Sequence, residues 1–113
     1  ISLRLIFPVL FSLLAPQGSA VCLVKPQFEA GRERLGKKGV VRDPKVHSAV
    51  LGEVLQAARQ QGFFAHGLSF SPITGADGNR EYLLLLKKEP PAEGFSLPEA
   101  AAVVQAAIGV LGA

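Results

Sequence analysis

A chain of 113 residues has the length of one small domain. With 49% hydrophobic and 19% charged residues it can bury a core, which excludes a chain that is disordered by composition. The net charge of +3 is mild, and a single cysteine, Cys22, excludes an internal disulfide and a multi-cysteine zinc site. The histidines, His47 and His66, lack metal-ligand spacing, so no metal site is expected. The chain contains no methionine, and we therefore expect a fragment of a longer protein.

The N-terminal segment predicts a helix from about Leu3 to Ala15, capped by Ser2 and kinked or loosened by Pro8. The same segment imitates a signal peptide, because one cation and an apolar stretch precede Gly18-Ser19-Ala20. It is too short and too interrupted by proline for a convincing membrane span, so stable membrane insertion is not expected. A buried or amphipathic helix of a soluble domain is favoured over secretion.

Residues 19–24 are apolar on both faces, which predicts a central strand of a covered sheet that ends before Pro26. An irregular loop is expected from Gln27 to Arg42, and loops of this length are usually functional or disordered. Between Gly31 and Arg42 there is one acid, Glu33, and there are five cations: Arg32, Arg34, Lys37, Lys38 and Arg42. This block suits a polyanion such as nucleic acid, or it is simply a solvated loop.

The second half of the chain predicts a helix, two strands and a last helix. Asp43 and Pro44 are expected to begin the first of these helices, and Gly62 is expected to end it. The strands Phe63–Ser71 and Tyr82–Lys87 flank a short, turn-rich connection, which predicts an antiparallel pair.

A linker is expected over residues 89–96. The final helix is expected over about Leu97 to Leu111, with Ser96 and Glu99 as a capping box at its start. The whole order indicates an α/β sheet whose last strand runs against its neighbours. Three strands make a thin sheet, which is typical of the C-terminal half of a larger doubly wound domain.

Three stretches carry a family resemblance: "ISLRLIFPVLFSLLAPQG", "LVKPQFEAGRERLGKKGVVRDPKVH" and "SPITGADGNREYLLLLKK". They resemble the hemolysin A (TlyA) family of FtsJ-like, S-adenosylmethionine-dependent ribosomal RNA 2′-O-methyltransferases. The resemblance covers residues 1–88 and implies the C-terminal portion of a Rossmann-like methyltransferase domain, with helices packed on the sheet and a terminal antiparallel strand pair. A C-terminal helix is expected over residues 97–113, and residues 89–113 match no family motif.

The resemblance also implies site residues. FtsJ-like active sites contain a Lys-Asp-Lys-Glu tetrad, in which Lys25 of "VKPQFE" matches the second lysine and Glu81 of "GNREYLL" matches the glutamate. The first lysine, the aspartate and the glycine-rich cofactor loop are expected upstream of Ile1, so the chain alone is expected to be inactive. Without the resemblance, Lys25 is a solvated charge, and Glu81 is a strand-edge acid that pairs with Arg80 or Lys87.

The proposed chemistry explains why these residue types are needed. A ribose 2′-hydroxyl is a very weak acid and the methyl donor is a sulfonium, so the main task is to position the oxygen for an in-line displacement. A neutral lysine can take the hydroxyl proton while carboxylates orient the groups. Open α/β sheets bind ligands at the carboxyl ends of their strands, which is where Lys25 follows its strand.

The implied partners are ribosomal RNA or a ribosomal subunit, contacted by the five cations of the basic loop. The implied cofactor is S-adenosylmethionine, the expected location is cytoplasmic, and a homo-oligomer is possible. Two alternatives stay open: a non-catalytic RNA-binding module, and a secreted, membrane-active protein of the kind that the name hemolysin suggests.

Overall fold

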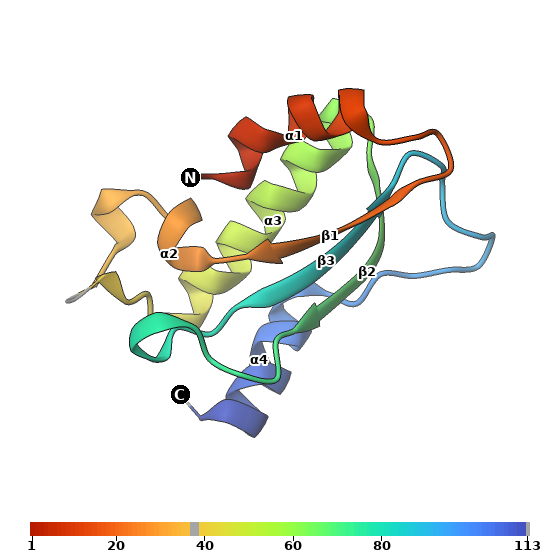
Figure 1. The fold of residues 1–113 in the computed structure, drawn as a ribbon. Coiled ribbons are helices and arrows are strands. Elements are labelled where there is room, and N and C mark those ends of the chain that lie inside the picture. The colour runs from red at the N-terminus through yellow and green to blue at the C-terminus, as the bar shows by residue number, and fades with distance from the viewer. Residues whose placement is uncertain (37–38, 113) are drawn as a thin grey trace.

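A computed structural model describes residues 1–36 and 39–112, apart from the side chain of Ala76. The elements follow one another in the order α1 (Leu3–Leu13), β1 (Ser19–Val24), α2 (Pro26–Glu29), η1 (Arg32–Arg34), α3 (Pro44–Gln61), β2 (Phe64–Phe70), η3 (Ala76–Gly78), β3 (Tyr82–Lys87) and α4 (Ala100–Leu111) (Figure 1). This composition confirms the α/β class.

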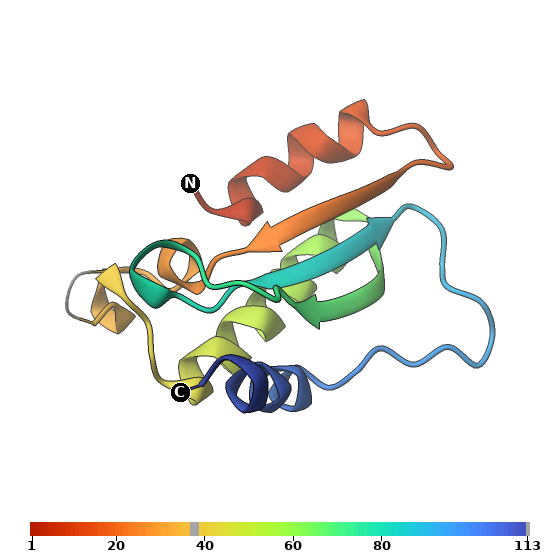
Figure 2. The ribbon, with the colours of Figure 1, turned by 60° about the horizontal axis from the view of Figure 1, so that its bottom comes forward.

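The strands form one three-stranded sheet in the order β1-β3-β2, with β3 antiparallel to both neighbours. The predicted antiparallel pair and the reversed last strand are therefore confirmed. Because β1 and β2 run in the same direction, their carboxyl ends meet the beginning of β3 at one end of the sheet (Figure 2). We call it the Val24 end, after the pair Val24–Tyr82 that closes the β1–β3 ladder there.

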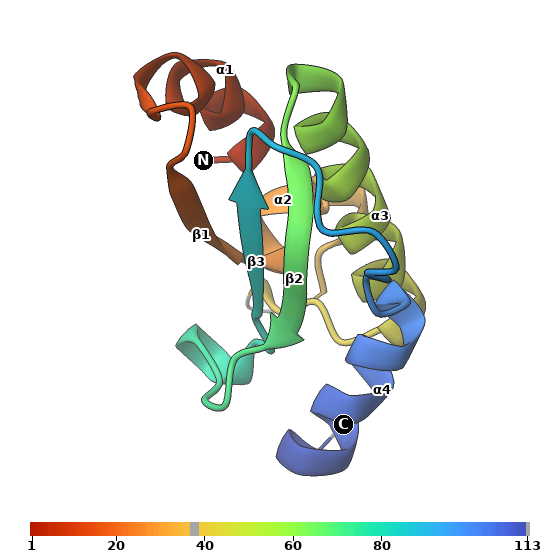
Figure 3. The same cartoon turned by 90° about the vertical axis from the view of Figure 1, so that its right-hand side faces the viewer.

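The core lies on one face of the sheet, which α3 covers with α1 and α4 packed against it. Figure 3 shows α3 and α4 together beside β2. Buried side chains on this face include Cys22, Val24, Tyr82, Leu84 and Leu86. The alternate residues of β1 point to the other face, where Val21 is 70% exposed and Leu23 is 40% exposed. Within the described part of the chain no helix covers this second face.

The prediction of a central, doubly covered strand for residues 19–24 is wrong for this chain. In the described residues β1 pairs only with β3, so it is an edge strand, and its burial alternates along the strand. A strand with apolar residues on both faces has the same sequence pattern whether its second face is covered or bare in this chain. The pattern alone therefore cannot tell the two situations apart.

Most predicted helix ends are confirmed. The Ser2 hydroxyl accepts from the backbone N–H of Arg4, the Asp43 carboxylate accepts from that of Lys45, and Gly62 ends α3 in the left-handed conformation. The predicted capping box is wrong. Helix α4 begins at Ala100 with Glu99 as its N-cap, and no side chain caps it.

Helix α1 packs one side on the core and exposes the other. Phe7 is buried and meets Phe63 edge to face at a ring-centroid distance of 6.0 Å, while Leu5, Val9 and Leu13 are exposed. Of the helices in residues 1–36 and 39–112, none has the combination of length and apolar character that a bilayer crossing requires.

The segment from Gln27 to Arg42 is more ordered than the predicted irregular loop, because it contains α2 and η1. Buried His47 ties the end of this segment to the sheet: its Nε2 donates to the Val41 carbonyl and its Nδ1 accepts from the Tyr82 hydroxyl, both at 2.7 Å. The carbonyl only accepts, so Nε2 must carry the hydrogen. Burial lowers the pKa of His47 and raises that of Tyr82, which keeps this pair neutral.

Candidate active site

Lys25 lies where β1 turns into α2. Its backbone is still extended (φ −109°, ψ 104°), and its carbonyl accepts from the N–H groups of Phe28 at 2.9 Å and Glu29 at 3.2 Å. Pro26 follows at the first helical position, where a missing N–H is harmless. The Lys25 ammonium lies 5.3 Å from the centroid of the Phe28 ring, which is 53% exposed. The end of the strand therefore presents a half-buried lysine beside an exposed aromatic ring.

Glu81 lies directly before β3 and is only 6% exposed. Its carbonyl accepts from the N–H of Ser71 at 2.8 Å, which extends the β2–β3 ladder by one step. The side-chain amide of Gln27 donates to Glu81 Oε2 at 2.9 Å, and a Cβ placed on Gly75 would collide with the same carboxylate. Gln27 of α2 and Gly75 of the β2–β3 connection thus pack against the same carboxylate.

The strand register relates Lys25 to Glu81. They are the next residues beyond the closing pair Val24–Tyr82, one on each strand, and directly opposite residues of an antiparallel pair share a face. Alternation along β1 places Lys25 on the face of Leu23, and along β3 it places Glu81 on that same, uncovered face. Both predicted catalytic residues therefore lie at the Val24 end and on one face.

No direct bond joins the two side chains among the described residues: Lys25 contacts Phe28, and Glu81 accepts from Gln27. The alternative partners of Glu81 are also not used. Arg80 is buried and donates to the carbonyls of Arg42 at 3.1 Å and Gly112 at 3.2 Å. The ion pairs within the described part of the chain do not include Glu81 with Arg80 or Lys87.

The cations of the predicted basic cluster have different environments in the structure. Arg34 is committed to Glu53 in α3 by two hydrogen bonds, of 3.0 and 3.1 Å, and this bonding lowers the pKa of Glu53. Arg32 and Arg42 are exposed. Lys37 and Lys38 lie outside the described residues.

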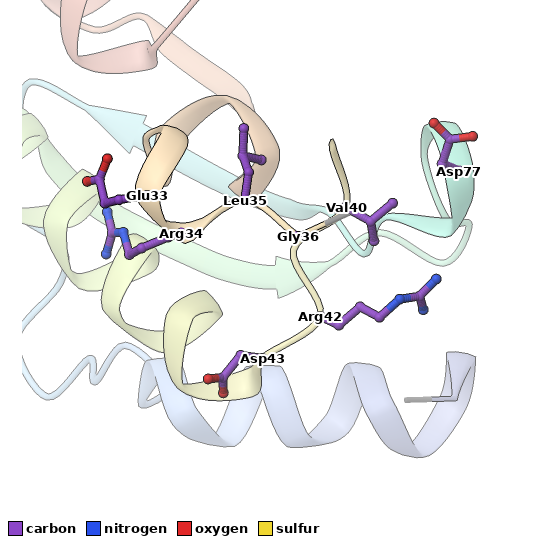
Figure 4. Close-up of a pocket in the computed structure, with 8 residues that line it drawn as sticks. All are labelled: Glu33, Arg34, Leu35, Gly36, Val40, Arg42, Asp43 and Asp77. Atoms are coloured by element: carbon purple, nitrogen blue, oxygen red, sulfur yellow. The ribbon is translucent and has the colours of Figure 1, made fainter. Parts of the chain in front are cut away.

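A cavity of about 700 Å³ opens beside this loop, in the range of small-molecule sites (Figure 4). It is lined by Glu33, Arg34, Leu35, Gly36, Val40, Arg42, Asp43 and Asp77. Figure 4 shows the Arg42 side chain extending toward the side on which Asp77 lies. Neither Lys25 nor Glu81 lines the cavity, so it is separate from the pair at the Val24 end.

A second buried acid near Lys25 has a structural role that the sequence did not reveal. Glu29 accepts from the Ser2 hydroxyl at 2.6 Å and from the N–H of Leu3 at 2.7 Å, and its Oε1 lies 3.6 Å from Arg4 Nε. These contacts satisfy the first turn of α1 with a carboxylate from α2. Glu29 therefore joins two helices.

The turn at the Val24 end lacks the pattern that usually holds a nucleotide-type cofactor. Nucleotide-type cofactors are usually held by a glycine-rich turn between a strand and a helix. The strand-to-helix turn at the Val24 end is Lys25-Pro26, which contains no glycine. Across residues 1–36 and 39–112, no group of three or more His, Cys, Asp or Glu side chains is placed to hold a metal ion.

Comparisons with known proteins show the family of the chain. The profile of the FtsJ-like methyltransferase family matches residues 2–88. YqxC of Bacillus subtilis, provisionally named an rRNA methyltransferase, is 58% identical over 100 residues, which are 88% of this chain and 36% of YqxC. TlyA of Mycobacterium tuberculosis, named a 16S/23S rRNA (cytidine-2′-O)-methyltransferase, is 37% identical over 89 residues, 79% of this chain and 33% of TlyA.

A solved structure from Streptococcus thermophilus, of a protein provisionally named a hemolysin, is also similar. It superposes with a TM-score of 0.85 at 43% identity, over 96% of this chain and 39% of that one. The chain spans 36% and 33% of the two curated relatives, about a third of their length. Because the family profile covers most of the sequence, the chain belongs to the FtsJ-like methyltransferase family.

Proposed function

We propose that these residues are the C-terminal part of a protein that methylates ribose 2′-hydroxyls of ribosomal RNA, with S-adenosylmethionine as the donor. In this proposal residues 1–88 complete the methyltransferase domain, residues 89–96 are a linker and residues 97–113 contain an added helix. The observation that supports the proposal is the β1–β3 register, which closes at Val24–Tyr82 and makes Lys25 and Glu81 the next residue on each strand. The family match and the name of TlyA support the chemistry.

In the proposed mechanism this chain supplies the groups that handle the acceptor hydroxyl. Bound S-adenosylmethionine supplies an electrophilic methyl group; its own binding residues are expected elsewhere in the whole protein. Lys25, in its neutral form, accepts the proton that the ribose hydroxyl loses. Glu81, held by Gln27 and Gly75, orients the hydroxyl and the amine. The Val24 end suits this role because alternation along β1 and β3 puts both side chains on the face opposite α1, α3 and α4.

The basic loop has a separate role in the proposal. Exposed Arg32 and Arg42 contact phosphates of the RNA, and Lys37 and Lys38 add charge to the same segment. Arg34, which is paired with Glu53, fixes η1 against α3 and contributes less to binding. A ribosomal RNA substrate implies a cytoplasmic location for the whole protein.

The experiment that tests the proposal compares Lys25→Ala with Arg32→Ala in the whole protein. We expect Lys25→Ala to lower kcat by about 100-fold or more, without a change in RNA affinity, because it removes a proton acceptor. Arg32→Ala should weaken RNA binding and reduce the slope of log affinity against log salt by about 1, because it removes a phosphate contact. Rates come from labelled methyl transfer to ribosomal RNA, and affinities from salt-dependent binding.

The opposite pattern would favour a non-catalytic RNA-binding module. In that case Lys25→Ala would weaken binding and its salt dependence as Arg32→Ala does, and any methyl transfer would proceed at the unchanged rate.

A further inference from the structure

Gln27 touches the candidate active site from the first turn of α2. Its Nε2 lies 2.9 Å from Glu81 Oε2, and the residues are 54 positions apart in the sequence. The orientation of the amide is fixed by chemistry, because an ionised carboxylate only accepts hydrogen bonds and the NH₂ group must therefore face it.

The other end of the same amide is unsatisfied. Gln27 Oε1 is a buried atom with no hydrogen-bond partner among the residues that the structure describes. A buried carbonyl oxygen without a donor is unfavourable, so such an atom in a site indicates a donor that arrives in another state.

Lys25 is the donor that fits best. It stands two positions before Gln27 in the sequence, and the two residues belong to the same turn of chain. Within residues 1–36 and 39–112 the contact recorded for its ammonium is with the exposed Phe28 ring, a weak interaction that it can leave. Arg80 is a second buried donor nearby in sequence: its two terminal nitrogens donate to the carbonyls of Arg42 and Gly112, and its Nε has no partner among the described residues. Adjacent extended residues point to opposite faces, which directs Arg80 away from the face of Glu81 and Gln27.

We propose that Gln27 is a positioning residue that bridges the two catalytic side chains. Its Nε2 holds the Glu81 carboxylate, and its Oε1 accepts an N–H of Lys25 when the lysine turns from Phe28 to the substrate. An amide is well suited to this, because it orients the amine without a negative charge that would favour the protonated form. The inference rests on the proposed function of Lys25 and Glu81.

The first test uses Gln27→Leu in the whole protein, with exposed Gln56→Leu on α3 as the matched control. We expect Gln27→Leu to lower kcat by about tenfold or more with the KM for RNA unchanged, since it removes a hydrogen bond to a charged group. In a Glu81→Gln background the same substitution should lower kcat by much less, because Gln27 acts through Glu81. Gln56→Leu should change neither constant.

A second variant, Gln27→Glu, distinguishes a loss of positioning from a folding defect. The carboxyl that this substitution introduces can donate to Glu81 when it is protonated, as the amide does, whereas its ionised form repels Glu81. The kcat of this variant, relative to the unchanged protein, should therefore rise as the pH is lowered. A structural defect alone would give the same relative loss at every pH.

The inference is overturned if Gln27→Leu keeps its kcat, if it costs the same factor with and without Glu81, or if the relative rate of Gln27→Glu does not change with pH. Failure of the underlying proposal has a different signature: Lys25→Ala and Glu81→Gln would themselves keep the full rate of methyl transfer.

Discussion

The Oε2 atom of Glu81 accepts from Gln27 and also lies close to Gly75. At Gly75 the absence of a side chain is what leaves room for the acid, since a Cβ there would collide with Oε2. Gly52 on α3 is the opposite case, because no atom lies within 4 Å of the position of its Cβ.

These two glycines make a matched pair of substitutions. Gly75→Ala should destabilise the chain by about 1–3 kcal/mol, because the buried carboxylate must move out of its hydrogen bond with Gln27. Gly52→Ala should stabilise it by about 0.5–1 kcal/mol, because alanine favours a helix interior. Urea unfolding measures both, and equal effects of the two substitutions would contradict the close packing of Gly75 on Glu81.

Residues that stand in a family motif could be predicted as site residues from the sequence. Residues whose bonding partners are far away in the sequence were missed. Lys25 and Glu81 follow from the family motifs. Gln27 stands inside the same motif, but its partner is 54 residues away. Glu29 binds Ser2 across 27 residues, and no local pattern indicates such a contact.

Among the elements, the link between the basic segment, α3 and β3 depends on one neutral imidazole. His47 joins the Val41 carbonyl to the Tyr82 hydroxyl, and its second nitrogen can accept this hydrogen bond only while it is unprotonated. Because burial lowers the pKa of His47, the unfolded chain binds this proton more readily than the folded chain.

The sign of the pH effect follows from that difference. Stability should be at its full value above the ordinary histidine pKa of about 6.5 and should fall below it, by at most about 1.4 kcal/mol per pH unit. Urea unfolding at several pH values between about 5 and 7.5 should show this slope, and His47→Gln should remove it. His66→Gln, at an exposed site, should retain it. An unchanged slope in His47→Gln would contradict the assignment.

The start of α4 shows why element boundaries were harder to predict than element types. Ser96 and Glu99 match a capping box, but Leu97 stands before Pro98, and a residue before proline is disfavoured in the helical region. The helix therefore begins only at Ala100, with Glu99 extended (φ −61°, ψ 138°). Asp43 and Gly62 carried no such conflict, and both ends of α3 were predicted correctly.

For the whole molecule, the two faces of the sheet differ. One face is packed by three helices, while the other exposes Val21 and Leu23 and carries Lys25 and Glu81 at its Val24 end. The strand directions could be predicted from the alternation of elements, whereas the position of β3 between β1 and β2 was not predicted. The bare second face could not, because it depends on what lies beside this chain in space.

Because the proposed cofactor-binding residues are expected elsewhere in the whole protein, we predict that the 113-residue chain alone transfers no methyl groups. It spans about a third of its curated relatives, and its described residues form the acceptor side of the proposed site without a glycine-rich cofactor turn. Incubation of the isolated chain with labelled S-adenosylmethionine and ribosomal RNA should give no incorporation, whereas the whole protein should label ribose 2′-oxygens. Incorporation by the isolated chain would show that it binds the cofactor unaided.

The central claim is that Lys25 and Glu81 act together on one hydroxyl, and a double-mutant cycle of methyl transfer in the whole protein tests it most directly. If they share a site, Lys25→Ala combined with Glu81→Gln should be about as slow as the slower single variant, because groups that act as a unit are not additive. If the two losses in kcat multiply, the residues act independently, and a shared active site at the Val24 end is contradicted.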